Sequence, residues 1–579
     1  MSKIIDGLMG FVVGDAMGVP VEFSMREKMF INPVTDMIGY GSHNVPAGTW
    51  SDDTSMTIAL IDSINNKNKI DYDDIMNNFK AWFNDAKYTP SDNVFDIGRT
   101  CLKAIRNYSK GINPLECGLK DINANGNGSL MRISPIAYYC YYNNLNDNEI
   151  LKLVNDISSL THAHEISLMG CYIYIKYLIF LLEGNNKLDA YHKIQNIDYS
   201  FYSNETIIKY ERILKNNIYE LSIDEIKSSG YIVDTLEASL WVLLNTDNYK
   251  HAIIGSINLG NDTDTIGAIC GSMAGLIYGY EDIEETWINT LIKKDYLIDI
   301  FNQFENNLCH SKKDAILGAI IGDIVGSRFE LNHCKKKKFD FMPYGKSRFT
   351  DDTVMTLAVA KTLLNYPNNN LEEEVINNMV EIGRKYHQCG FGRSFHKWIT
   401  TDNHEPYNSY GNGAAMRISA CGIVAKNKKE VKEISKIITS VSHNHPDGIK
   451  GAEAVAMMIY LIKEGKNKEE LKQYFIENYY PIDFTLKDLI GKYKFKIACK
   501  ETVPQAFMAF YESINFEDAI RKAMYIGGDS DTIGAICGSM AGLYYGIPNY
   551  IYEDSYKFLD DYLLDIYNSF NTKYNELKV

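Results

Sequence analysis

Apolar residues recur three and four positions apart along much of this chain, which is the spacing of one face of an α-helix. Runs that alternate apolar and polar residues between turn signals, as β-strands do, are hard to find. The pattern therefore predicts an all-α protein of compact helical domains. The segments with helical spacing are 54–65, 149–159, 165–183, 205–216, 352–364, 371–387, 447–464 and 515–526.

Four series of glycines at spacing four interrupt this pattern. Each glycine costs a helix about 1 kcal/mol relative to alanine, so three on one face need a reason. We expect each series to mark a place where a helix backbone closely approaches another backbone or a ligand. The membrane interpretation of such a stripe fails, because the apolar segments are short and an aspartate opens two of them. The series are Gly10, Gly14 and Gly18; Gly267, Gly271 and Gly275; Gly318, Gly322 and Gly326; and Gly534, Gly538 and Gly542.

The same sequence motifs occur twice along the chain, in the same order. Residues 264–276 and 531–543 share the same thirteen letters. The spacing between equivalent residues falls from 308 at Glu22 and Glu330 to 267 at Asp264 and Asp531, so we expect insertions in the first copy, near 180–230. A period this long exceeds that of solenoids, and each unit should fold alone. The prediction is two tandem domains, residues 1–308 and 309–579, with the boundary in the polar segment 305–313.

Composition narrows the class of protein. The formal net charge of -15 argues against a nucleic-acid-binding surface, since phosphate contacts need clustered Lys and Arg. The eleven cysteines are scattered and form no Cys-x-x-Cys pair, which favours a reducing compartment. We find no signal peptide and no apolar run of the ~20 residues that a bilayer span needs. We therefore expect a cytoplasmic protein without a membrane segment.

Repeated acidic residues carry the candidate chemistry. Asp262 and Asp264, like Asp529 and Asp531, stand where a glycine-striped helix begins. Capping of a helix N-terminus explains one such aspartate but not the second, nor the separate Asp-Asp pairs at 52–53 and 351–352. Several carboxylates in one pocket repel one another unless divalent cations neutralise them, and oxygen ligands suit Mg²⁺, Mn²⁺ or Ca²⁺. We infer a metal site in each copy rather than an EF-hand, because Ile266 and Met273 stand where EF-hand ligands would be.

Three further recurring motifs are less specific. His162-Ala-His164 and His443-Asn-His445 allow a zinc amidohydrolase, but we favour one ring that packs against a ligand, with His164 and His445 as surface or helix-cap residues. Glu22 and Glu330 each follow a glycine-rich helix, where a carboxylate could reach a substrate. The segments 127–132 and 412–417 (Asn-Gly-x-x-Met-Arg) could offer backbone amides to a phosphate, although they lack the lysine of a Walker loop.

In this order the motifs resemble those of the ADP-ribosylglycohydrolases, including the dinitrogenase reductase-activating branch, over nearly the whole chain and twice. The resemblance implies an all-α fold that holds two divalent cations per domain, Mg²⁺ or Mn²⁺. It implies hydrolysis of the bond between ADP-ribose and a protein side chain or small molecule, with Glu22 and Glu330 at the scissile bond. The implied metal ligands are Ser51, Asp52, Asp53, Asp262, Asp264 and Thr265 in the first copy, and Thr350, Asp351, Asp352, Asp529, Asp531 and Thr532 in the second. The implied ADP-ribose contacts are Gly126, Asn127, Gly128, Ser129 and His162, and Gly411, Asn412, Gly413, Ala414 and His443.

The two copies also differ from each other. Glu165 stands where the second copy has Pro446, which casts doubt on the His loop of the first copy. We interpret the chain as a fusion of two related enzymes with different substrates, and an internal pseudo-dimer is compatible with a monomer. The alternatives are a binding or immunity protein that recognises an ADP-ribosyltransferase or its modified targets, with one domain inactive, and a hydrolase of another glycoside.

Overall fold

The protein is described here by a computed structural model that covers residues 2–330, 334, 336–368 and 370–574. These residues form α-helices and short 3₁₀-helices, and the only β-structure among them is a few isolated bridges such as Gly126–Tyr231 and Gly411–Ala498. The predicted all-α fold is confirmed.

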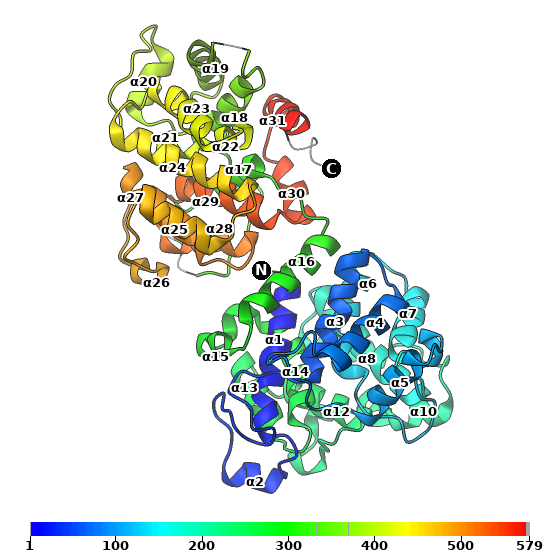
Figure 1. The fold of residues 1–579 in the computed structure, drawn as a ribbon. Coiled ribbons are helices and arrows are strands. Elements are labelled where there is room, and N and C mark those ends of the chain that lie inside the picture. The colour runs from blue at the N-terminus through cyan, green and yellow to red at the C-terminus, as the bar shows by residue number, and fades with distance from the viewer. Residues whose placement is uncertain (1, 331–333, 335, 369, 575–579) are drawn as a thin grey trace. The chain divides into compact units, whose positions relative to one another are not determined.

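The chain folds as two compact units, Met1–Leu308 and Cys309–Val579 (Figure 1). The helices of the first are α1 (Lys3–Gly18), α2 (Arg26–Ile31), α3 (Asp52–Lys67), α4 (Tyr72–Asp85), α5 (Arg99–Ser109), α6 (Pro135–Tyr142), α7 (Asp147–Ser159), α8 (Glu165–Leu182), α9 (Lys187–Gln195), α10 (Asn204–Lys209), α11 (Glu211–Lys215), α12 (Ile232–Leu244), α13 (Tyr249–Ile257), α14 (Thr263–Tyr278), α15 (Glu285–Thr290) and α16 (Lys294–Leu308).

The second unit begins at α17 and ends at α31. Its helices are α17 (Ala315–Gly326), α18 (Asp351–Leu363), α19 (Leu371–Lys385), α20 (Arg393–Thr400), α21 (Gly413–Met416), α22 (Ser419–Val424), α23 (Lys428–Ser440), α24 (Pro446–Lys463), α25 (Lys468–Asn478), α26 (Leu486–Leu489), α27 (Cys499–Tyr511), α28 (Phe516–Ile526), α29 (Ser530–Tyr545), α30 (Asn549–Tyr556) and α31 (Asp561–Tyr574).

The predicted helical segments all fall on helices, with one difference. Segment 205–216 is split into α10 and α11 at Tyr210, whose buried hydroxyl donates to the carbonyl of Ile166 at 2.6 Å. The polar segment 305–313 is helical up to Leu308, because α16 continues far enough to bury Glu305 and Leu308. Polarity along a short segment does not by itself distinguish a linker from the end of an amphipathic helix.

The glycine stripes of the first domain join α1 to α14. A Cβ atom added at Gly14 would lie 2.0 Å from the carbonyl oxygen of Gly267, and one added at Gly271 would lie 2.2 Å from that of Gly10. At the end of α1, a Cβ on Gly18 would lie 2.3 Å from Cα of Asp264. The two backbones therefore touch along the whole stripe, and no side chain fits between them.

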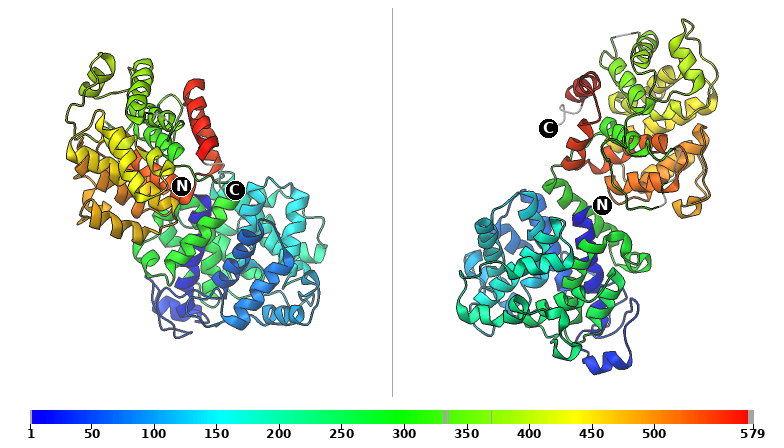
Figure 2. Two further views of the ribbon diagram at one scale, coloured as in Figure 1. Left: turned by 45° about the horizontal axis from the view of Figure 1, so that its top comes forward. Right: turned by 180° about the vertical axis from the view of Figure 1, so that it is seen from behind.

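The second domain repeats this contact between α17 and α29. A Cβ on Gly322 would lie 1.9 Å from the carbonyl oxygen of Gly534, and one on Gly318 would lie 2.1 Å from that of Gly538. In both domains the first helix thus packs against a helix from the last third of the domain. Figure 2 shows this for α1, in blue, beside the green helices of its domain.

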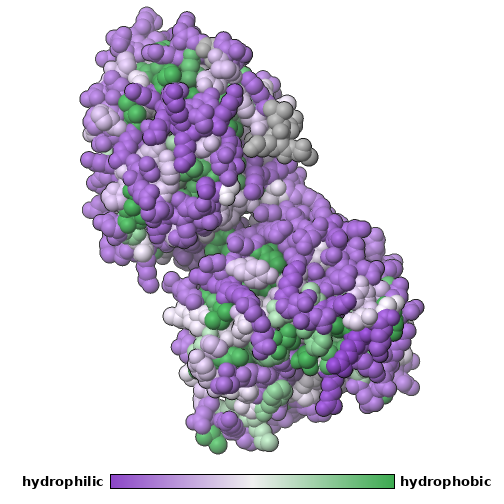
Figure 3. Space-filling view, viewed as in Figure 1, coloured by the Kyte–Doolittle hydropathy of each residue, from purple (hydrophilic) through white to green (hydrophobic). Residues whose placement is uncertain are grey.

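Two helical segments, Lys3–Val21 and Glu165–Leu182, are long and apolar enough to cross a membrane by length and composition alone. Within the structure 94% and 83% of these windows are buried, as expected of core helices. The face of the molecule in Figure 3 is mainly hydrophilic, with separate apolar patches. Phe23, Met25, Phe30 and Ile31, around α2, are among the exposed apolar residues of the first domain.

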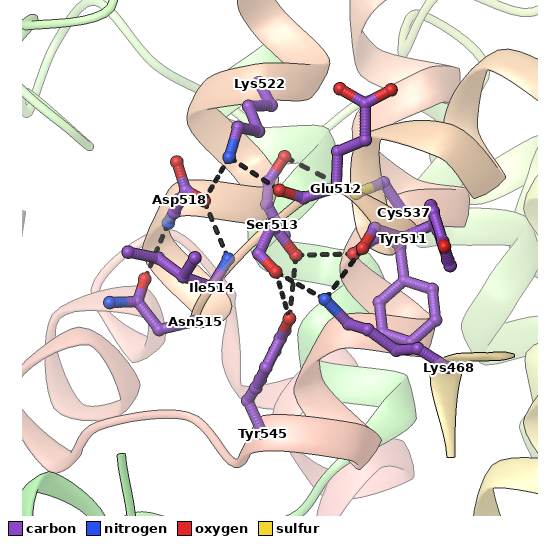
Figure 4. A network of polar contacts seen from close by, with 12 residues as sticks. Lys468, Tyr511, Glu512, Ser513, Ile514, Asn515, Asp518, Lys522, Cys537 and Tyr545 are labelled. Carbon is purple, nitrogen blue, oxygen red and sulfur yellow. Dashed lines mark hydrogen bonds and ion pairs between the residues drawn. The ribbon is translucent and has the colours of Figure 1, made fainter. Parts of the chain in front are cut away.

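The turn between α27 and α28 of the second domain is fastened by lysines (Figure 4). Lys468 donates to the carbonyls of Tyr511 and Ser513, and Lys522 donates to the carbonyl of Glu512 and the carboxylate of Asp518. A cation is favourable there because the last carbonyls of a helix have no partner within it and carry partial negative charge. In the first domain Lys187 bonds the carbonyls of Leu243 and Thr246 in the same way. The anchor holds the helices that pack behind α29 and α14.

We expect Gly14→Ala to destabilise the first domain by more than about 1–3 kcal/mol, because its methyl group would overlap a backbone carbonyl that has no freedom to move. The measurement is thermal unfolding of the full chain. The matched control is Gly98→Ala, where an added Cβ meets nothing within 4 Å. Equal melting temperatures for the two variants would contradict the backbone contact.

Candidate active site

A buried aspartate of α1 sets the position of α3. The carboxylate of Asp15 accepts hydrogen bonds from the amide of Ser51 at 3.0 Å, the amide of Thr54 at 3.1 Å and the hydroxyl of Thr54 at 2.5 Å. It thereby binds the first turn of α3, whose free amides favour a negative charge. Asp52 and Asp53 lie in that turn and are buried.

The second domain repeats the arrangement with Asp323 of α17. Its carboxylate accepts from the amide of Thr350 at 2.8 Å, the amide of Thr353 at 3.0 Å and the hydroxyls of both threonines at 2.7 and 2.5 Å. Asp351 and Asp352 thus begin α18 as Asp52 and Asp53 begin α3.

The hydroxyl residues before these helices serve as caps. Ser51 accepts from the amide of Asp53 at 3.2 Å, and Thr350 accepts from the amide of Asp352 at 3.3 Å. Thr265 and Thr532, predicted as further oxygen ligands, are buried beside the acids, and the Thr532 hydroxyl lies 3.4 Å from the Asp352 carboxylate. The hydroxyl groups of these four residues therefore all lie beside aspartates of the two domains.

Asp262 and Asp529 occupy the N-cap positions of α14 and α29, yet neither side chain caps its helix. Each carboxylate instead accepts a hydrogen bond at 2.7 Å from the side-chain amide of Asn127 or Asn412, respectively. Capping therefore does not account for these aspartates. The predicted substrate-binding asparagines are used to hold them, since each also bonds the hydroxyl of Thr235 or Thr502.

Glu22 joins the aspartates of α14 in the folded domain. Carboxylate oxygens of Glu22, Asp262 and Asp264 lie within 4.8 Å of one another, and Glu330, Asp529 and Asp531 form the same cluster in the second domain. In the first domain two backbone bonds of 2.7 Å between residues 23–24 and Asn261 fasten the segment after Glu22 to the start of α14. The close approach of α1 and α14 explains why residues so far apart in sequence meet here.

Burial and like charge perturb the carboxyl groups of the first domain. Burial, reinforced by Asp96 and Asp262 and opposed by a hydrogen bond from His43, raises the pKa of Glu22 to about 8. Burial raises the pKa of Asp15 to about 6, although its hydrogen bonds oppose the shift. Burial followed by repulsion from neighbouring carboxylates raises the pKa of Asp52, Asp53 and Asp264 well above the usual range.

The second domain shows the same electrostatics with a more open glutamate. Burial and the charge of Asp531 raise the pKa of Asp351 to about 8 and that of Asp323 to about 7. The same two causes raise the pKa of Asp352 and Asp529 well above the usual range. Glu330 is half-buried, and its pKa is raised by burial and Asp531 while Arg348 opposes the shift.

These clusters fit hard divalent cations. The buried oxygens Asp53 Oδ2, Asp264 Oδ1 and Asp352 Oδ1 accept no hydrogen bond from any described residue. An unpartnered buried carboxylate oxygen is costly unless something outside the chain satisfies it. The donors are oxygen atoms of carboxylates and hydroxyls, which Mg²⁺ and Mn²⁺ prefer.

The recurring histidines take different positions. His162 and His443 are buried, and burial beside Arg132 or Arg417 lowers the pKa of His162 to about 3 and that of His443 well below its usual range. Each neutral ring lies against the glycine of its Asn-Gly motif, since a Cβ on Gly128 or Gly413 would lie 3.4 Å from the ring Nε2. In the described chain neither histidine belongs to a cluster of possible metal ligands, so a zinc site has no support here.

The second histidine of each pair caps a helix. His164 accepts from the amide of Ile166 at 3.3 Å at the start of α8, and His445 accepts from that of Asp447 at 3.1 Å at the start of α24. Glu165 stands where the second domain has Pro446. Its carboxylate points away from the His loop and accepts hydrogen bonds from Ser203 and the hydroxyl of Thr206. It anchors α10 in the insertion of the first domain and leaves the His loop unchanged.

The predicted ADP-ribose segments are only partly accessible. Ser129 is buried and hydrogen-bonded to Ser158 at 2.9 Å, and Ala414 is buried in the core. Gly126, Gly128, Gly411 and Gly413 are half-buried. These half-buried glycines are therefore the parts of the two segments that solvent can reach.

Sequence reasoning left out four residues of the site. Asp15 and Asp323 occupy equivalent positions in the two copies, so the sequence repeat alone could have identified them. Asp96 lies close enough to raise the pKa of Glu22, Asp52 and Asp264, and with Glu22 and His43 it forms a further group of ligand atoms within 4.8 Å. No repeated pattern pointed to His43 or Asp96.

Comparison with known proteins finds relatives of this chain. The model of the ADP-ribosylglycohydrolase family matches residues 1–314 and again residues 305–574. ADP-ribosylarginine hydrolase Tri1 of Pseudomonas putida (strain GB-1) is 31% identical over 290 residues, which is 48% of this chain and 72% of that protein. Tri1 of Serratia proteamaculans (strain 568) is 29% identical over 306 residues, 52% of this chain and 79% of that protein. The ADP-ribosyl-dinitrogen reductase glycohydrolase of Rhodospirillum rubrum is 29% identical over 295 residues, 50% of this chain and 91% of that protein.

The chain therefore belongs to the ADP-ribosylglycohydrolase family and carries two copies of the family domain in tandem. It is an enzyme, an ADP-ribosylglycohydrolase. The resemblance drawn from the repeated motifs is confirmed.

We expect Asp15→Asn to weaken Mn²⁺ binding by the first domain about 10–100-fold, because the first turn of α3 loses the anion that orients it. Titration calorimetry of the full chain with Mn²⁺ measures this. Asp323→Asn should affect only the second set of sites, and the exposed Asp198→Asn should affect neither. Unchanged binding in Asp15→Asn would contradict the role of Asp15.

A second expectation concerns pH. The folded, metal-free protein keeps protons on carboxyls with raised pKa, such as Glu22 and Asp351, whereas the unfolded chain releases them near pH 4. The free energy of unfolding should therefore fall as pH rises from about 4 to about 8. Cations would bind the cluster in its deprotonated form, so the rise in Tm produced by Mg²⁺ should be larger at about pH 8 than at about pH 5. Thermal unfolding at both pH values decides this, and an equal or smaller rise at pH 8 would refute it.

Proposed function

We propose that each domain removes ADP-ribose from modified protein side chains or small-molecule conjugates, using two divalent cations, Mg²⁺ or Mn²⁺. The observation that supports the proposal is the same in both domains. Two aspartates at the start of α14 or α29 meet Glu22 or Glu330, and the Asp-Asp pairs at 52–53 and 351–352 lie close enough for the charges of these clusters to raise their pKa. Some of the buried carboxylate oxygens accept no hydrogen bond from any described residue.

In the first domain the cations would be held by Ser51, Asp52, Asp53, Asp262, Asp264 and Thr265, and in the second by the equivalent residues 350–352, 529, 531 and 532. When bound, such cations polarise substrate oxygens and lower the pKa of water. Asp15 and Asn127 would keep the ligands oriented, since each holds one of the segments from which they come.

The reaction adds water across the glycosidic bond. The oxygen of water forms a bond to the anomeric carbon of the ribose, the bond from that carbon to the acceptor breaks, and a proton reaches the acceptor. Glu22 and Glu330 would take a proton from water and return one to the leaving group. The raised pKa of Glu22, about 8, suits transfer near neutral pH, and burial and the charge of Asp531 raise the pKa of Glu330 in the same direction. The remaining carboxylates stabilise positive charge that develops on the ribose.

Arginine is the first acceptor to examine, since two relatives are named ADP-ribosylarginine hydrolases. We further propose that the two domains act on different substrates, because Glu22 is buried beside His43 whereas Glu330 is more open and has Arg348 nearby. The cysteines are scattered and form no disulfide among the described residues, which supports a cytoplasmic location. The net charge argues against nucleic acid as a partner, and a monomer is the simplest assembly for a chain with two domains.

A binding or immunity role with one inactive domain is less well supported. Loss of activity should first remove the acids, and both domains keep the full set in the same places.

The deciding experiment is release of free ADP-ribose from arginine-linked and serine-linked substrates with Mg²⁺, Mn²⁺ or EDTA. We expect EDTA to abolish release, and Asp264→Ala and Asp531→Ala each to lower the activity of its own domain at least about 10²-fold. The exposed Asp198→Ala is the control and should match the wild type. Activity that survives EDTA, or that persists in the double variant, would overturn the proposal.

A further inference from the structure

A short loop of the first domain, residues 40–45, is built tightly onto the segment that carries Glu22. A Cβ atom on Gly41 would lie 1.6 Å from the carbonyl oxygen of Pro20, so only glycine permits this approach. The amide of Ser42 donates to that same carbonyl at 2.8 Å, and its hydroxyl donates to the carbonyl of Glu22 at 2.5 Å.

The loop closes on itself as well. The amide of Tyr40 bonds the carbonyl of Val45 at 2.7 Å, and the amide of Asn44 bonds that of Gly41 at 3.1 Å. Tyr40 and Asn44 both adopt the left-handed backbone conformation, with φ of 59° and 51°. A non-glycine residue is rarely found there without a structural reason. Together these contacts fix where the next side chain, His43, can go.

That side chain reaches the carboxylate of Glu22. His43 Nε2 and Glu22 Oε2 lie 2.5 Å apart, and the two side chains are only 15% and 6% exposed. The imidazole ring has Phe23 and Phe95 as neighbours, at centroid distances of 6.0 and 5.2 Å. The ring is therefore held in place before any substrate arrives.

In the part of the second domain that the structure describes, no histidine is held against the glutamate as His43 is held against Glu22. No described residue there donates a hydrogen bond to the carboxylate of Glu330, and among the described residues the charge of Arg348 is what stabilises its anion. The connection is also shorter, since Thr350 follows Glu330 by 20 residues whereas Ser51 follows Glu22 by 29.

We propose that His43 is a positioning residue specific to the first domain. It holds one oxygen of Glu22 and so leaves the other directed at the reacting bond in a single orientation. This inference rests on the proposed role of Glu22 in catalysis. A carboxylate tied at one oxygen needs no reorientation during the reaction, which is the advantage of a preorganised site.

The test uses the full chain with Asp531→Ala, so that only the first domain acts. His43→Leu removes the donor, whereas His43→Gln keeps an amide nitrogen at similar reach. We expect His43→Leu to lower kcat for release of ADP-ribose at least about 10-fold while KM and Tm stay near the parent values. His43→Gln should retain most of kcat, and added imidazole should restore part of the activity of His43→Ala.

Three results would overturn the assignment. The first is an unchanged kcat in His43→Leu. The second is an equal loss in His43→Gln and His43→Leu together with a lowered Tm, which would show a purely structural role. The third is a fall in bound Mn²⁺ in His43→Leu, because Glu22, His43 and Asp96 would then act as metal ligands.

A separate measurement keeps this test independent of the proposed function. The ¹⁵N chemical shifts of the His43 ring should change between the Asp531→Ala parent and its Glu22→Gln derivative if the hydrogen bond exists. A parent that releases no ADP-ribose would refute the proposed function of the first domain. Unchanged ring shifts would refute the contact between His43 and Glu22.

Discussion

Each domain depends on one contact, the packing of two glycine-lined helices with their backbones touching. In the first domain α1 and α14 meet at Gly10, Gly14, Gly267 and Gly271 with no side chain between them. Helices separated by larger side chains would stand several ångströms further apart, at the usual 8–10 Å between axes. The close approach brings the end of α1 onto the start of α14, so that Glu22 and Asp264 share one cluster.

The same helix carries the second half of the site. Asp15 lies on α1 between Gly14 and Gly18, and its buried carboxylate binds the first turn of α3. One helix therefore places both acidic segments, one through backbone packing and the other through charge-assisted hydrogen bonds. In the motif Gly-Asp-x-x-Gly the glycines pack against the second helix, and the aspartate binds the turn that carries the other acids. Helix α17 repeats both contacts with Gly322 and Asp323.

Burying several carboxylates together costs electrostatic free energy, and bound cations would reduce that cost. Several carboxylates that are buried together hold protons to unusually high pH, and some of their oxygens are left without partners. Folding alone would not favour such a cluster, because buried like charges repel and lose their hydration. The divalent cations that we propose for each domain would neutralise this cluster. The two domains then differ at the glutamate, which His43 holds in the first and which is more open in the second.

Helical periodicity, the glycine spacing and the doubled motifs are local properties of the chain, so they were readable without coordinates. They correctly predicted the all-α fold, the family and the type of enzyme. They also predicted which acids recur and that these acids share a pocket with the glutamate, as Glu22, Asp262 and Asp264 do. The partners of single side chains depend on contacts between distant segments, and no spacing encodes those. For that reason only the tertiary structure showed that Asn127 holds Asp262, that His164 caps a helix, and that Glu165 leaves the His loop alone. His43 has no counterpart in the repeat pattern, and its role emerged only when the loop around Gly41 was folded against Glu22.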